Sequence, residues 1–371
     1  MKKLRIIILI IVSSVLFSGS SYENFLDKQM YSAKKSGFMN EIPKDAEILL
    51  NSAGIEDFDY ESISSLSVKD VAELFLNGFI INIKEPFESI FIITAVSILT
   101  SVIKSFSEDF SLSGKIINIV TTLVTSSVFL VPVKKLISVS AGIIEECSNF
   151  MLAFIPVYSS AVAASGYISS AAGFRTIMMG TVTIISKIAA NIISPLLCIY
   201  LALCIASAVS DFDISSIAKS VKNSAIWILS FIMTVFSGIM GLGTILSTSV
   251  DGSVSKTAKF FIGSFIPVVG SAVSDSFSTV KSCLSVTKNF LGIYAIIVIA
   301  AIFIPPIISL FSWKICFSVS SGISLISGNK TLSSLISSVA SVLGIIMALV
   351  VITAVMFIFS VTIMLLTGGG L

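Results

Sequence analysis

Long runs of apolar residues, separated by short polar stretches, dominate the chain from Pro86 onward. An apolar run of about 18 residues is long enough to cross the hydrocarbon core of a bilayer as a helix. The run over residues 177–209 is too long for one simple crossing and contains Lys187 and Pro195. The last run, residues 335–366, is also long. The pattern predicts an all-α, polytopic transmembrane protein with eight candidate spans: 86–103, 116–133, 147–165, 177–209, 225–249, 258–274, 289–312 and 335–366.

The N-terminal part of the chain has a different pattern. Three basic residues among the first five precede a short apolar run and then a cluster of small residues, so residues 1–21 are predicted to be a secretory signal peptide. An uncleaved anchor helix is the alternative. Residues 22–85 hold twelve acidic and six basic residues and predict a short, acidic, helical segment outside the cytoplasm. The polytopic membrane domain then covers residues 86–371.

One nonapeptide occurs twice in the apolar region. Phe154–Val162 returns as Phe265–Val273 with seven of nine positions identical, at an offset of 111 residues. At the same offset Pro195 matches Pro306. Many membrane translocation folds are built from such internal repeats. An odd number of crossings per copy makes the repeats inverted, and an even number makes them parallel. The matches predict a duplicated unit with copies of approximately 116–209 and 227–320.

Pro156 and Pro267 occupy equivalent positions in the two copies, beside Gly166 and Gly270. A proline inside a helix removes one backbone hydrogen bond, and the carbonyl left without a donor at membrane depth needs protein or water beside it. We therefore expect re-entrant hairpins or discontinuous helices, with these four residues as candidates for a pore or hinge. An ordinary kink that aids packing is the alternative. Three further glycines are candidates for close helix packing or oligomerisation: Gly238, Gly241 and Gly243.

Four charged residues lie in or near the apolar segments. Charges at membrane depth are costly and usually face water or a partner. Lys187 is the best candidate for an embedded charge, because apolar sequence flanks it on both sides, and Arg175 lies nearby. Glu145 and Glu146 are candidates for the same role or for a position at the membrane interface.

The positive-inside rule leaves the orientation of the spans open. A cleaved signal places residue 22 outside, and the first span then delivers Lys104 and Lys115 to the cytoplasm, as the rule prefers. Simple alternation next places Lys134 and Lys135 outside, against the rule. Either 116–133 is not a full crossing or these lysines are exceptions.

Composition excludes several kinds of chemistry. The 371 residues have a mean hydropathy of +1.04, and only 12% of them are charged. The absence of histidine removes the commonest acid–base group and the commonest ligand for transition metals. The five cysteines form no CxxC pair, and no phosphate-binding loop or protease triad is found. We expect a protein that is not an enzyme and that holds no cofactor or metal.

The layout and two stretches resemble the stage III sporulation protein AE family of endospore-forming bacteria. The stretches are Pro156-Val-Tyr-Ser-Ser160 with Ala164-Ser-Gly166, and Thr257-Ala-Lys-Phe260 with Gly263 and Phe265-Ile-Pro-Val-Val-Gly270. The resemblance implies a subunit of a channel or secretion-like complex in the mother-cell membrane that surrounds the forespore, needed for development after engulfment. It implies as partners other stage III sporulation operon A proteins, namely an ATPase, ring-forming subunits and membrane subunits, and indirectly a forespore membrane protein. Membrane lipid is expected as a partner, and nucleic acid is not.

Two other readings of the sequence stay open. A stand-alone secondary transporter built from two repeats would use Lys187 or Arg175 to bind an anionic substrate. A purely structural assembly scaffold would form no pore. The sequence does not separate these readings from a conduit.

Overall fold

The computed structural model describes residues 37–52, 55, 84–106, 111–210, 214–265 and 270–366, and all regular structure within these ranges is helical. The predicted signal peptide, residues 1–21, lies outside the described residues, as does most of the acidic segment. The elements are the 3-10 helix η1 (Phe38–Glu41), α2 (Lys44–Ser52), α5 (Lys84–Phe106), α6 (Ser111–Ala164), α7 (Ile168–Ile188), the π-helix η2 (Ala189–Ile193), α8 (Ser194–Val209), α9 (Ser215–Phe265), α10 (Gly270–Ile326) and α11 (Lys330–Leu366).

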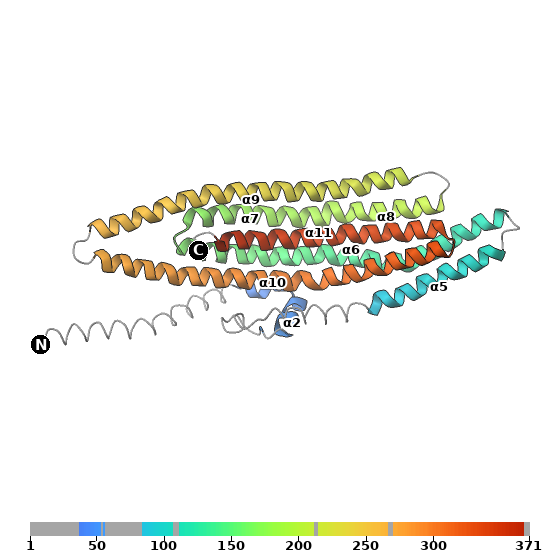
Figure 1. Ribbon diagram of the computed structural model, residues 1–371, viewed down its shortest axis with the longest axis horizontal. Helices are drawn as coiled ribbons and strands as arrows, with labels where there is room; N and C mark the ends of the chain where they lie inside the picture. The colour runs from blue at the N-terminus through green and yellow to red at the C-terminus, as the bar shows by residue number, and fades with distance from the viewer. Residues whose placement is uncertain are drawn as a thin grey trace.

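The long helices form an antiparallel, up-and-down bundle (Figure 1). Helices α5, α7–α8 and α10 run in one direction, and α6, α9 and α11 run in the other. Helix α11 contacts α6, α7, α8, α9 and α10, and its contact with α10 is the most extensive in the bundle. The apolar stretch of α10 is 61% buried and that of α11 is 56% buried. The apolar stretches of the other helices are only 22% to 28% buried. The core of the bundle is therefore built around α10 and α11.

Within the described residues, six helical stretches that are long and apolar enough to cross a membrane take the place of the eight predicted spans. The predicted spans 116–133 and 147–165 belong to the single helix α6, and the predicted span 258–274 straddles the end of α9 and the start of α10. Lys134 and Lys135 are exposed on the surface of α6 rather than in a loop outside the membrane. At about 1.5 Å per residue, the 54 residues of α6 extend about 81 Å, well beyond a hydrocarbon core of about 30 Å.

A π-helical turn explains how the long apolar stretch from α7 to α8 stays continuous. Pro195 lacks an N–H and its ring would crowd the preceding turn of a regular α-helix. The turn before it widens into the π-helix η2, and the Ser194 hydroxyl donates to the Ala189 carbonyl at 2.9 Å. Figure 1 shows α7 and α8 following one another along the bundle. The predicted span 177–209 is thus the larger part of one helical stretch.

Glycines in the left-handed region end two of the long helices. Gly166 has φ +90°, and the amide of Tyr167 donates back to the Val162 carbonyl at 3.3 Å. Gly328 has φ +79°, and the next residue, Asn329, accepts from the Leu332 amide at 3.3 Å as the N-cap of α11. Gly166, a predicted hinge candidate, therefore forms the reversal between α6 and α7, a conformation that glycine adopts without the cost of a Cβ.

The short N-terminal helices pack on the bundle through buried apolar side chains, of which Phe38 is the largest. Phe38 of η1 is fully buried, and its ring centroid lies 5.8 Å from that of Phe154 and 6.3 Å from those of Phe150 and Tyr294. Phe150, Phe154 and Tyr158 recur every fourth residue along α6, so their rings stack on one face of that helix. The segment thus packs against α6 and α10.

The described parts of the two copies of the nonapeptide lie in different elements. Phe154–Val162 belongs to α6, which continues through Pro156, so the expected break in the first copy is wrong. The second copy starts at the last residue of α9 and ends in α10, and Pro267 lies outside the described residues. The structure does not confirm the predicted repeat. Two passes of the chain, α7–α8 and α9, separate the copies, so a duplication would be parallel rather than inverted.

Candidate functional site

The charged residues singled out from the sequence lie on the outside of the bundle. Glu145 and Glu146 on α6, and Arg175 and Lys187 on α7, are all exposed. None of the four lines either of the two cavities described below. Lys187 therefore lies on the outer face of an apolar helix rather than in the protein interior.

The glycines predicted to mediate close packing face open space. A Cβ built on Gly238 or Gly241 would meet no described atom outside its own helix within 4 Å. These residues do not bring α9 close to another helix in the described part of this chain. Gly243 and Gly270 belong to α9 and α10, in stretches whose side chains lie outside the described residues.

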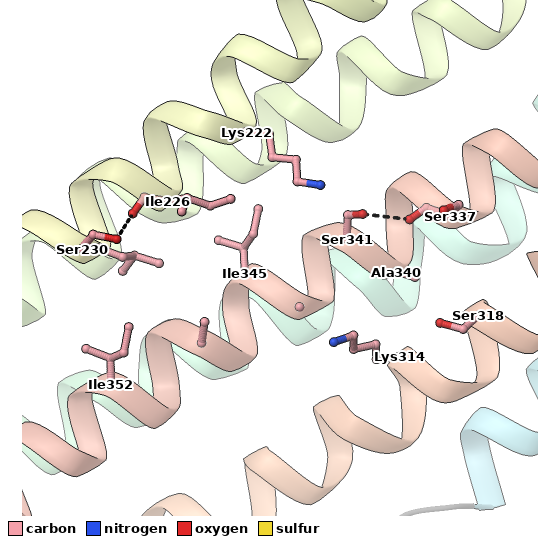
Figure 2. A pocket seen from close by; sticks show the side chains of 13 residues that line it. Lys222, Ile226, Ser230, Lys314, Ser318, Ser337, Ala340, Ser341, Ile345 and Ile352 are labelled. Carbon is pink, nitrogen blue, oxygen red and sulfur yellow. Dashed lines mark hydrogen bonds between the residues drawn. The ribbon is translucent and has the colours of Figure 1, made fainter. Parts of the chain in front are cut away.

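A polar cavity of about 530 Å³ lies between the described parts of α9, α10 and α11. Figure 2 shows it from close by with the thirteen side chains that line it. Two lysines approach from the flanking helices, Lys222 from α9 and Lys314 from α10, and both are half-buried. The other lining residues are serines and small or apolar side chains: Ile226, Leu229, Ser230, Ser318, Ser337, Ala340, Ser341, Gly344, Ile345, Ala348 and Ile352.

Helix α11 supplies a hydroxyl-bearing face to this region. Ser334, Ser337, Ser338 and Ser341 follow at spacings of three, one and three residues, which places them on one side of a helix with 3.6 residues per turn. Ser341 donates to the Ser337 carbonyl at 3.1 Å, as Figure 2 shows, and Ser338 donates to the Ser334 carbonyl at 3.0 Å. Their hydroxyl oxygens keep lone pairs for further bonds, and a hydroxyl hydrogen can rotate to another acceptor.

Gly344 lies opposite the Lys314 ammonium. A Cβ built on Gly344 would be 3.5 Å from Lys314 Nζ and 3.6 Å from its Cε. The ammonium group therefore rests against the backbone of α11, where a larger side chain would occupy its space. Figure 2 shows Lys222 and Lys314 directed toward α11 from opposite sides.

A second cavity of about 360 Å³ between α8, α9 and α11 shares Lys222 with the first. It is lined by further hydroxyl groups, by the exposed Lys219, and by Tyr200 and Cys204 of α8. Ser334 and Ser338 of α11 line this second cavity, beside Ser337 and Ser341 of the first. The polar lining thus continues across α11 from one cavity to the next.

A buried lysine elsewhere in α10 has a different role. Lys288 is 1% exposed, and its Nζ donates to the Leu365 carbonyl at 3.2 Å and lies 5.7 Å from the centroid of the Tyr167 ring. Leu365 lies in the last turn of α11, where carbonyls lack partners within the helix and the helix dipole favours a cation. Lys288 therefore holds the end of α11 against α10 and the α6–α7 connection.

The described residues offer hydrogen bonding and charge rather than a metal centre. Among the side chains that the structure describes, no group of three or more His, Cys, Asp or Glu residues is placed to hold a metal ion. The cavity can bind by ammonium charge and hydroxyl groups, since those are the polar groups that line it.

Sequence reasoning missed the residues of this cavity. The serine pattern at the start of α11 was a usable signal, because its spacing places hydroxyl groups on one helical face. Lys222 and Lys314 were weaker signals, because each lies close to polar residues that suggest a helix end.

Within the described residues, six helical stretches are long and apolar enough to cross a membrane: Pro86–Ile103, Ile119–Ala164, Ile168–Val209, Ser215–Gly241, Leu284–Ile326 and Lys330–Leu366. Large apolar side chains also cover the outer faces of the bundle. Val131 is 73% exposed, Phe91 67%, and Trp227 66%, with the Trp227 ring stacked on Phe231. Such surfaces suit lipid rather than water. The bundle thus defines a polytopic helical membrane protein.

Comparison with known proteins identifies the family. The chain belongs to the stage III sporulation protein AE family, whose sequence profile matches residues 56–368. It is 27% identical over 227 residues to the stage III sporulation protein AE of Bacillus subtilis (strain 168). That alignment covers 61% of this chain and 57% of the relative, so the chain spans little more than half the length of the curated relative it matches. No solved structure matches the chain.

Proposed function

We propose that this protein is a non-enzymatic membrane subunit of a channel or secretion-like complex that the mother cell needs to sustain the forespore after engulfment. The observation that carries the proposal is the family match over residues 56–368, which includes all six membrane-competent helical stretches. Its proposed partners are the other stage III sporulation operon A proteins, namely the ATPase, the ring-forming subunits and the membrane subunits. A forespore membrane protein would be an indirect partner.

We propose an orientation in which the α6–α7 connection faces away from the cytoplasm. The α10–α11 connection lies at the opposite end of the bundle (Figure 1). Lys219, Lys222, Lys314 and Lys330 lie in the half of the bundle near that connection and near the start of α9. The positive-inside rule favours this end on the cytoplasmic side. An outward position for η1 and α2 is consistent with the predicted signal peptide.

A conduit needs a polar path through or along the bundle, whereas a scaffold does not. The core around α10 and α11 is packed with apolar side chains, so an open pore along the axis of a single described bundle has no support. The half-buried lysines and serines between α9, α10 and α11 support a polar path along the side of α11 instead. We therefore favour a conduit formed at that face together with partner subunits.

Deletion of the gene tests the proposal. The deletion strain should grow normally in vegetative culture, complete engulfment, and then fail to form heat-resistant spores, and a wild-type copy should restore them. An affinity-tagged copy should co-purify the ATPase and ring-forming subunits from membranes of sporulating cells. A normal spore yield from the deletion strain would contradict the proposal.

A further inference from the structure

We propose that the cavity between α9, α10 and α11 is a binding site for a phosphate-type oxyanion, held by Lys222, Lys314 and the hydroxyl groups of α11. Two sources share this chemistry: free phosphate and the phosphate headgroup of an anionic lipid. The cavity volume of about 530 Å³ is large enough for either group.

The charges around the cavity are unbalanced. Lys222 and Lys314 line one cavity. The described side chains of the three lining helices, in 215–241, 284–326 and 330–366, include no Asp or Glu. These helices therefore supply no carboxylate to neutralise the two ammonium groups. A bound anion would offset a repulsion that grows as the local dielectric constant falls.

Both lysines lie away from the ends of their helices. Lys222 lies seven residues after the first residue of α9, and Lys314 lies twelve residues before the last residue of α10. These separations correspond to about 10 Å and about 18 Å along the helix axes. Both lysines lie within membrane-competent stretches, where a charge is retained only beside water or a partner.

The side chains that line the cavity can bind the oxygens of a phosphate group. Lysine binds phosphate as a point charge, and serine hydroxyl groups donate to its oxygens. Ser337 and Ser341 lie on the face of α11 between the two lysines, and Ser318 and Ser230 add hydroxyl groups from α10 and α9 (Figure 2). Ser230 and Ser341 now donate to carbonyls of their own helices, at 3.0 and 3.1 Å, and each can rotate toward a ligand.

The test uses the purified full-length protein and two probes. One arm titrates inorganic phosphate onto protein in uncharged detergent and measures binding by calorimetry and by the shift in Tm. The other arm places the protein in phosphatidylcholine vesicles with or without phosphatidylglycerol and measures the change in Tm. Saturation by phosphate alone assigns the free anion, and a response to phosphatidylglycerol alone assigns the lipid headgroup.

Three variants make the test specific. Lys222→Gln and Lys314→Gln should each raise the Kd for the responding probe about tenfold or more, because each removes a charged hydrogen bond. Gly344→Leu should weaken binding without changing charge, because its side chain enters the space of the Lys314 ammonium. Lys187→Gln is the matched control and should bind as the wild type does, because Lys187 lies on the outer face of α7.

Two results would overturn the proposal. It fails if the wild type responds to neither probe up to about 10 mM phosphate, about ten times the concentration at which a site with a Kd of 1 mM is half filled. It also fails if the lysine variants and Gly344→Leu respond as the wild type does. If a lysine variant does not fold, the wild-type titrations with the two probes still decide the test. Spore formation is a separate measurement, so loss of this site and loss of the sporulation role are distinguishable.

Discussion

Lys288 Nζ of α10 donates a hydrogen bond to the Leu365 carbonyl in the last turn of α11, at 3.2 Å. The two residues are 77 positions apart in the chain, so this contact joins the interior of one core helix to the end of the other. It was not evident from the sequence, where Lys187 was the more conspicuous embedded charge.

Lys288→Ala should lower the free energy of unfolding. The change removes a charge-assisted hydrogen bond and leaves space around a side chain that is 1% exposed, so a loss of about 1–3 kcal/mol is expected. Hydrogen exchange should rise in the last turn of α11. Lys187→Ala, on an exposed surface, should leave both thermal unfolding and exchange unchanged. Equal behaviour of the two variants would contradict the assigned role.

Two glycines of α10 should respond oppositely to alanine. A Cβ at Gly292 would lie 2.6 Å from Leu365 Cδ2 and 3.0 Å from Tyr158 Oη, so Gly292→Ala should destabilise the bundle by about 1–3 kcal/mol through overpacking. A Cβ at Gly322 meets nothing within 4 Å, so Gly322→Ala should stabilise by about 0.5–1 kcal/mol through helix propensity. Thermal unfolding in detergent measures both. A stabilising Gly292→Ala would show that α10 and α11 are not packed as described.

Phe38→Ala should release the N-terminal segment from the bundle while leaving the bundle folded. Phe38 is fully buried among aromatic rings of α6 and α10, and truncating a buried Phe costs about 3–5 kcal/mol. Limited proteolysis should then cut within residues 37–52 at lower protease concentrations than in the wild type. Ile48→Ala on α2, at a position 67% exposed, is the control and should not change the cleavage. Unchanged resistance in Phe38→Ala would rule out this anchor.

Cysteine labelling should place the two ends of the bundle on opposite sides of the membrane. Ile168 begins α7 and is 66% exposed, and Ile326 ends α10 and is 88% exposed. In a variant without native cysteines that is expressed in vegetative cells, an impermeant maleimide should label Ile168→Cys in intact cells and Ile326→Cys only after permeabilisation. Labelling of both positions from the same side would disprove the proposed topology.

The sequence predicted the class of the fold but not the number of helices. The apolar runs do lie in helices, but hydropathy alone indicates a loop at the polar pair Lys134–Lys135. In the structure α6 continues through both lysines, which lie on its exposed face. Hydropathy also says nothing of where two helices join, so it merged the end of α9 with the start of α10.

The prolines and charges show a second limit of local reasoning. Pro156 predicted a break, yet a helix with a packed aromatic face continues through it. Lys187 was predicted to be a membrane-embedded charge because of its apolar neighbours, but apolar neighbours do not say which face of a helix is buried, since that depends on where the other helices pack. The cavity around Lys222 and Lys314 needs three helices from different parts of the chain. Only the serine spacing on α11 is visible without that tertiary information.

The burial of α10 and α11 sets the order in which the bundle can mature during synthesis. Synthesis proceeds from the N-terminus at about 5–20 residues per second. The two helices that form the core follow all the others in the described chain. Helices α5 to α9 therefore enter the bilayer before the core helices on which they pack exist, and they must be held there by lipid or by insertion factors until α11 emerges. A ribosome that stalls before α11 therefore produces a chain that lacks one of the two core helices, rather than a slightly shortened protein.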